Sequence, residues 1–172
     1  MRPAVIVLVL LLSVAAALAS AAGGAPGESC ATAERQDLDF VLGNWLVRDA
    51  SGDAVGTATI ASAYAGCVLL ETRLGAGRIT QSLGVIGFEP ESGRWHRDFL
   101  GPSGVVLSFR GRKEGPAMVM TGKEYRPEGV QLHRIEWKPA GEGKIEERWQ
   151  TSTDDGRSWQ AGFQGVFHRI AE

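Results

Sequence analysis

KIEERWQTSTDDGRSWQAGFQGVFHRI, residues 144–170, holds two runs of alternating polar and apolar residues joined by a short loop. A period of two is typical of β-strands that bury one face. In the loop, we expect the Asp154 carboxylate to bind free backbone amides and Gly156 to supply a positive φ. Trp159 then begins the inward face of the second strand. The stretch therefore predicts an antiparallel hairpin.

The same alternation recurs along most of the chain. Between residues 37 and 172 it indicates about ten short strands, separated mainly by turns that contain Gly or Pro. Residues 37–43 (DLDFVLG) predict one helical turn before the first strand. Because closure protects the edge strands of such a meander, we expect an all-β fold: a single antiparallel up-and-down barrel over residues 37–172.

The N-terminus has the order of features found in secretory signals. Arg2 precedes an apolar run over residues 4–12, and small residues follow, including Ala19 and Ala21. A membrane anchor is the alternative, but the apolar run is shorter than the roughly 20 residues that span a bilayer. We expect residues 1–21 to be a signal peptide, so that the protein is secreted or periplasmic and does not insert into the membrane after cleavage.

The two cysteines, Cys30 and Cys67, both follow the expected signal. An even count in an oxidising compartment predicts one disulfide. The alternative, a redox or metal pair, lacks C-x-x-C spacing. Residues 22–36 are small or polar and indicate a flexible N-terminal arm, which the disulfide would tie to a strand.

The charge balance bears on the partners. The formal net charge is −2, and no basic cluster occurs along the chain. Nucleic acids and anionic membranes favour clustered basic surfaces, so neither is expected as a partner. No motif predicts a cofactor or a metal. The sequence leaves the oligomeric state open.

The alternation also predicts which side chains face the barrel interior. The inward residues proposed to line a ligand site are Gln81, Trp95, Arg97, His133, Glu147, Trp149 and Phe163. A buried charge needs a partner of opposite sign or water. Arg97 and Glu147 therefore indicate a structural ion pair with each other, or a bulge that turns one of them outward.

Alternatively, Arg97 binds the acidic head of an amphipathic ligand, since its planar fork suits a carboxylate. The tail of such a ligand would lie among Trp95, Trp149, Phe163 and Leu83.

STDDGRSW, residues 152–159, fits the S-x-D-x-G-x-[ST]-W signature of sialidases. That resemblance implies several such boxes, an arginine cluster and a tyrosine nucleophile. This chain has one box, and its only tyrosines are Tyr64 and Tyr125. The segment therefore indicates a turn and not a glycosidase.

DFVLGNWLV contains Gly43-x-Trp45, which resembles the G-x-W element of lipocalins and related calycin barrels. With GCVLLETR, GRWHRDFL, RIEWKP and ERWQTSTDDGRSWQAGFQGVFHR, it is similar to an uncharacterised group of exported, lipocalin-like bacterial proteins, a domain of unknown function. The resemblance covers residues 38–169 and implies a barrel with a small cavity but no assigned reaction. It also implies that Trp45 closes one end of the barrel, stacked beneath Arg169. Nitrobindin-type barrels, which are related, bind haem through a histidine.

These observations favour a carrier or sensor of a small amphipathic or hydrophobic molecule. Three alternatives stay open: a self-filled barrel that acts as an envelope interaction protein, an enzyme with Glu147 or His133 as a base, and a haem protein using His133. A ligand-binding role inferred from fold alone is an analogy.

Overall fold

The computed structural model describes residues 30, 32–76 and 81–171. The expected signal peptide, residues 1–21, and the first part of the expected arm, residues 22–29, lie outside the described residues. Within the described part of the chain, no helix combines the length and the apolar character needed to cross a bilayer.

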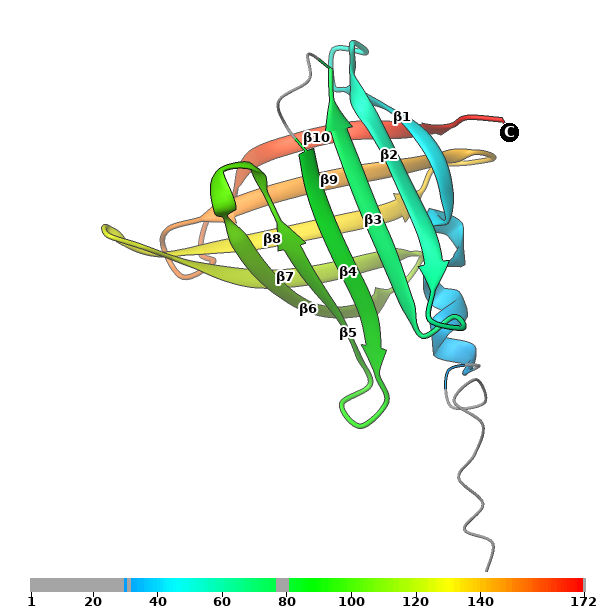
Figure 1. Ribbon diagram of the computed structural model, residues 1–172. Helices are drawn as coiled ribbons and strands as arrows, with labels where there is room; N and C mark the ends of the chain where they lie inside the picture. The colour runs from blue at the N-terminus through cyan, green and yellow to red at the C-terminus, as the bar shows by residue number, and fades with distance from the viewer. Residues whose placement is uncertain (1–29, 31, 77–80, 172) are drawn as a thin grey trace, which may run out of the picture.

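Ten antiparallel strands form one closed barrel, as the alternation predicts (Figure 1). The elements in chain order are η2 (Ala33–Val41), β1 (Gly43–Asp49), β2 (Ala54–Ala63), β3 (Val68–Gly75), β4 (Gln81–Glu89), β5 (Arg94–Leu100), η3 (Pro102–Gly104), β6 (Val106–Glu114), β7 (Ala117–Arg126), β8 (Gly129–Pro139), β9 (Lys144–Ser152) and β10 (Gln160–Arg169). Each strand pairs with its neighbours in sequence, and β1 pairs with β10 to close the barrel. The topology is therefore up-and-down throughout.

The 3-10 helix η2 covers one end of the barrel, where β2 turns into β3 (Figure 1). It begins at Ala33, so the prediction that residues 22–36 form a flexible arm is wrong for its last four residues. The helix forms there because it is anchored. Leu38 and Val41 are buried in the core, and Arg35 Nη1 donates a hydrogen bond to the Gly66 carbonyl at 2.8 Å.

The disulfide Cys30–Cys67 is present and joins the segment before η2 to the β2–β3 turn. It confirms the pairing expected from the cysteine count. A cross-link of this span stabilises a fold mainly by restricting the unfolded chain. Because Cys30 lies just before η2, the same cross-link also holds the helix over the barrel end.

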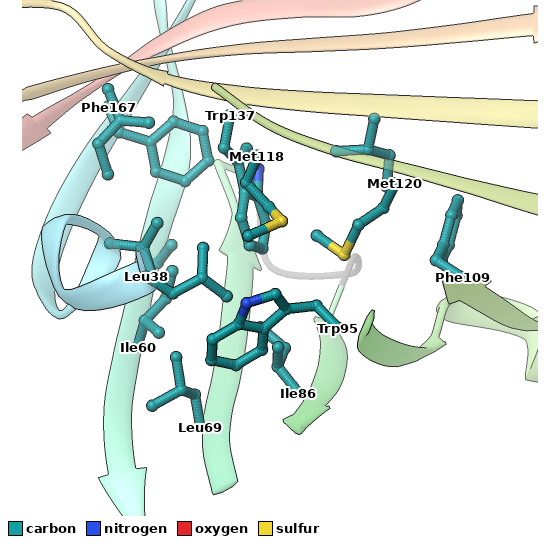
Figure 2. Packing of buried hydrophobic residues seen from close by; sticks show 14 of the residues in the cluster. Leu38, Ile60, Leu69, Ile86, Trp95, Phe109, Met118, Met120, Trp137 and Phe167 are labelled. Atoms are coloured by element: carbon teal, nitrogen blue, oxygen red, sulfur yellow. The ribbon is translucent and has the colours of Figure 1, made fainter. Parts of the chain in front are cut away.

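The apolar core occupies the end that η2 covers (Figure 2). Leu38 reaches from the helix toward Ile60 and Trp95, and Phe167 lies on the opposite side of the same cluster. Met118 is fully buried beside them. These side chains fill the end of the barrel. Burying each of them contributes roughly 1.5–3 kcal/mol to stability.

Trp45 and Arg169 complete the closure of this end. Trp45 is buried and donates its indole N–H to the Val41 carbonyl at 2.9 Å. The Arg169 guanidinium carbon lies 4.3 Å from the centre of the Trp45 ring, and Nη1 donates to the Leu42 carbonyl at 2.7 Å. The stacked pair that the G-x-W resemblance implied is therefore present. Gly43 has a φ of 133°, and a Cβ there would lie 2.3 Å from Arg169 Nη1, so the position requires glycine.

The loop between β9 and β10 is the turn expected from its sequence. Asp154 accepts hydrogen bonds from the Ser158 amide at 2.9 Å and from its hydroxyl at 2.6 Å. The Gly156 amide donates to Ser152 Oγ at 2.9 Å, and Gly156 has a φ of 81°. The hydroxyl and amide of Ser158 hold the pKa of Asp154 at about 2. All of these contacts are made within the turn.

The prediction that Trp159 faces inward is wrong. The pairing of β10 with β9 shifts register between Ala161 and Phe163, which inserts one extra residue, Gly162. Such a bulge reverses which face of the sheet the residues before it point toward. Trp159 therefore lies on the outer surface beside Leu132, and alternation alone could not reveal the inserted residue.

The facing predicted for β4 is also wrong. Gln81 and Leu83 point outward, and Leu83 is 41% exposed. Ser82 and Ile86 point inward instead, together with Gly84 between them. Sequence reasoning followed the aliphatic phase of this strand, but beside Gly84 the interior is occupied by the charged side chains of Glu71 and Arg97.

Substituting Gly84 by Ala tests this facing. The added Cβ would lie 2.7 Å from Glu71 Oε2 and 3.1 Å from Glu71 Cβ. We expect the free energy of unfolding, measured by urea denaturation, to fall by about 1–3 kcal/mol through overpacking. Gly87→Ala is the control, because nothing lies within 4 Å of its Cβ position. Equal effects of the two substitutions would contradict the inward position of Gly84.

Candidate functional site

Arg97 is fully buried in the barrel interior and is bound by Glu71. Its Nε and Nη2 atoms donate to Glu71 Oε2 at 2.9 and 2.7 Å. Its Nη1 atom has no hydrogen-bond partner. Instead, the guanidinium carbon lies 4.9 Å from the ring centre of Phe99 and 5.1 Å from that of Trp137. Cation–π contacts of this kind stabilise a desolvated guanidinium.

Arg73 links this pair to a second glutamate. Arg73 Nε donates to Glu71 Oε1, Nη1 lies 2.8 Å from Glu147 Oε2, and Nη2 donates to Glu147 Oε1 at 3.1 Å. We call Arg97, Glu71, Arg73 and Glu147 the interior charge network. The predicted ion pair between Arg97 and Glu147 is therefore wrong, because each is paired with a residue of β3.

The network keeps Glu71 ionised. Burial raises the pKa of this carboxyl, but the charges and hydrogen bonds of Arg73 and Arg97 outweigh burial and hold the pKa at about 2. Burial likewise opposes the charge of Arg73, but the carboxylates of Glu147 and Glu71 raise its pKa above the ordinary value. Two cations and two anions are thus paired with one another inside the barrel.

A glycine on a neighbouring strand makes room for Glu71. Glu71 pairs across the sheet with Gly84, and a Cβ at Gly84 would lie 2.7 Å from Glu71 Oε2. Glu147 pairs with Gly165, where a Cβ would instead meet the Arg48 carbonyl oxygen at 2.4 Å and the Phe163 ring at 2.6 Å. Small residues opposite large ones let the charged side chains extend across the interior.

A cavity of about 270 Å³ opens at the barrel end opposite η2. The apolar side chains around it are those of Val47, Val55, Leu74, Phe99, Pro102, Trp149 and Phe163. Arg73 and Ser82 are its inward-facing polar residues, and the Arg73 side chain is 18% exposed. The cavity is therefore an apolar space with one partly accessible guanidinium.

Larger hollows lie on the outer surface. One of about 410 Å³ is lined by exposed or half-buried polar side chains, including Arg48, Lys138 and Glu146. Sites for small ligands are concave and mostly apolar, with few polar groups. The interior cavity fits that description, whereas this hollow does not.

His133 faces the interior, as expected, and supports the cavity wall. Its Nδ1 atom lies 3.0 Å from Trp149 Nε1, and its Nε2 atom lies 2.9 Å from Glu124 Oε2. An indole N–H can only donate, so His133 Nδ1 accepts this hydrogen bond. The ring N–H is then on Nε2, which donates a hydrogen bond to Glu124. Both ring nitrogens are engaged, so a role as a base or an iron ligand would require breaking one of these bonds.

The structure brings together only part of the predicted ligand site. Trp149 and Phe163 line the cavity. Arg97 is buried beneath Arg73 and does not line it, and Trp95 lies in the core at the opposite end of the barrel. Gln81 is exposed on the outer face. Leu83, expected beside a ligand tail, is outside as well.

Sequence reasoning missed Glu71 and Arg73. Both lie on β3, where the inward phase is Leu69, Glu71 and Arg73. The other phase, with Leu70 and Leu74, has a similar apolar content, so alternation alone did not separate the two. A usable signal was the spacing of Glu71 and Arg73 two residues apart, which places opposite charges on one face of a strand.

No protein-family model matches the chain, and no curated protein matches it. In the described part of the chain, no group of three or more His, Cys, Asp or Glu side chains is arranged to hold a metal ion. What the cavity binds must therefore be inferred from its shape and charge.

The pKa of Glu71 predicts a loss of stability in acid. Its value of about 2 in the folded protein lies below the ordinary 4.5, so the unfolded chain binds the proton first as the pH falls. The stabilisation is complete above about pH 4.5 and is lost as the pH falls through about 2. In Glu71→Gln, the slope of unfolding free energy against pH in this window should be smaller by up to about 1.4 kcal/mol per pH unit.

Urea denaturation at a series of pH values measures both slopes. Glu71→Gln should also be less stable near neutral pH by about 3–5 kcal/mol, since Arg97 loses its charged partner. The control is Glu146→Gln, which removes an exposed carboxylate from β9 and should keep the wild-type slope. A Glu71→Gln variant with that same slope would show that the carboxylate does not titrate as described.

Proposed function

We propose that the protein binds a small, largely apolar molecule in the cavity at the open end of the barrel. The observation that carries the proposal is the position of Arg73. It is the member of the interior charge network that reaches the cavity, among aromatic and aliphatic walls. A ligand would place its apolar part against Phe99, Trp149 and Phe163 and its polar group on Arg73.

The arrangement supports binding more than catalysis. Glu147 is fully buried and bound to Arg73, and His133 has both ring nitrogens engaged. General acid–base catalysis needs a group within hydrogen-bond reach of the substrate proton. The group offered to the cavity is instead a guanidinium, which donates hydrogen bonds and stays protonated at neutral pH, so it cannot act as a base.

We also propose that the protein works outside the cytoplasm. The N-terminal segment has the charge and apolar pattern of an export signal, and the disulfide Cys30–Cys67 is typical of oxidising compartments. The resemblance to exported lipocalin-like proteins supports the same location. A carrier or sensor of a small apolar molecule is consistent with that compartment.

Intact mass spectrometry of the protein expressed with its own N-terminus in a Gram-negative host tests the location. We expect the periplasmic fraction to contain a chain cleaved after Ala19 or Ala21, with both thiol hydrogens lost. A full-length chain retained in the membrane fraction would instead favour the anchor alternative.

Filling the cavity tests the binding role. Ser82 faces the cavity, so Ser82→Leu should fill it without removing a charge. We expect wild-type protein to bind octan-2-one in isothermal titration calorimetry, and Ser82→Leu to bind it at least about tenfold more weakly, a change of ~1.4 kcal/mol. Gln81→Leu, which adds the same side chain to the outer face, should bind like wild type. Absence of binding to wild type, or equal binding by Ser82→Leu, would refute the proposed site.

A further inference from the structure

We propose that the cavity selects an uncharged ligand with a hydrogen-bond acceptor, such as a small ketone or ester, over a carboxylate of the same size. This inference rests on the proposed function and concerns the chemical class of the ligand. An unpaired interior arginine would favour a ligand with an acidic head group. Arg73 is already paired, and it therefore favours a neutral ligand instead.

The first reason is the number of donors that Arg73 has left. A guanidinium carries five N–H groups. The Nε–H is bound to Glu71, and Nη1 and Nη2 each contact Glu147. N–H groups on the terminal nitrogens therefore remain, and the side chain is 18% exposed at the cavity. One such donor is enough to bind a carbonyl oxygen.

The second reason is the charge balance around those donors. Glu71 and Glu147 already neutralise Arg73, and Arg97 in turn pairs with Glu71. A carboxylate entering the cavity would add a third anion beside two cations, against walls that are mostly apolar. Burying an ionised carboxylate without a matching cation costs several kcal/mol. A carbonyl group avoids most of that cost and still accepts the hydrogen bonds.

The remaining contacts also favour a neutral molecule. The aromatic walls of the cavity are Phe99, Trp149 and Phe163. The negatively charged faces of such rings attract cations and not anions. At about 270 Å³ the cavity is slightly smaller than the roughly 300–1,000 Å³ of sites for drug-sized ligands. We therefore infer a compact, neutral molecule with a single carbonyl-type group.

A pair of probes of equal chain length tests the inference. Octan-2-one and octanoate are titrated into the wild-type protein by calorimetry at about pH 8, where a carboxylic acid is fully ionised. We expect the ketone to bind at least about tenfold more tightly, a difference of ~1.4 kcal/mol. Equal affinities, or tighter binding of octanoate, would overturn the inference while leaving cavity binding established.

Glu147→Gln changes the selectivity through charge alone. It removes one of the two carboxylates on Arg73 and keeps the size of the side chain. Octanoate should then bind at least about tenfold more tightly than it binds wild type, whereas the affinity for octan-2-one should change by less than about threefold. Glu146→Gln, the exposed neighbour on β9, should leave both affinities unchanged.

The outcomes separate the two proposals. A folded Glu147→Gln variant with unchanged octanoate affinity would overturn the charge argument. If Glu147→Gln does not fold, the comparison of the two probes on wild-type protein still decides the inference. If neither probe binds to folded wild-type protein, the proposed function itself fails, and the ligand class fails with it.

Discussion

Four charged side chains inside a closed barrel need one another, because Glu71, Arg97 and Glu147 are almost completely removed from water. Glu71 accepts from both Arg97 and Arg73, and Arg73 also binds Glu147. Removing any member would leave an opposite charge buried without a partner, which is among the most destabilising changes in a protein interior. The glycine at position 84, the facing of β4 and the polarity of the cavity all depend on this network.

The network also divides the barrel into two functional halves. On the inward face of β5, Trp95, Arg97 and Phe99 follow one another from the closed end to the open end. The closed end is filled by apolar side chains and covered by η2, which the disulfide and the Trp45–Arg169 stack hold in place. The open end keeps a cavity above the charges. The apolar core and the cavity proposed to bind a ligand therefore lie at different ends of one barrel.

The interior errors of sequence reasoning share one physical cause. An outward face rich in aliphatic residues and an inward face carrying paired charges reverse the usual relation between hydrophobicity and burial. On β3 and β4 this reversal hid Glu71 and Arg73 and misplaced Gln81 and Leu83. On β5 and β9, where large apolar residues flank the charged ones, Arg97 and Glu147 were correctly placed inside. Their partners were not, because pairing depends on which strands face each other across the barrel.

The sequence by itself determined the class of fold, the number of strands, the disulfide and the β9–β10 turn. Periodicity and turn chemistry act between residues that are close in the chain. The disulfide follows from the cysteine count, because two cysteines allow a single pairing. Only the tertiary structure decided the pairs in the charge network, the outward position of Trp159 and the arginine that reaches the cavity. Those depend on one inserted residue in β10 and on distances across a closed barrel, where Arg73 and Glu147 meet although 74 residues separate them in the chain.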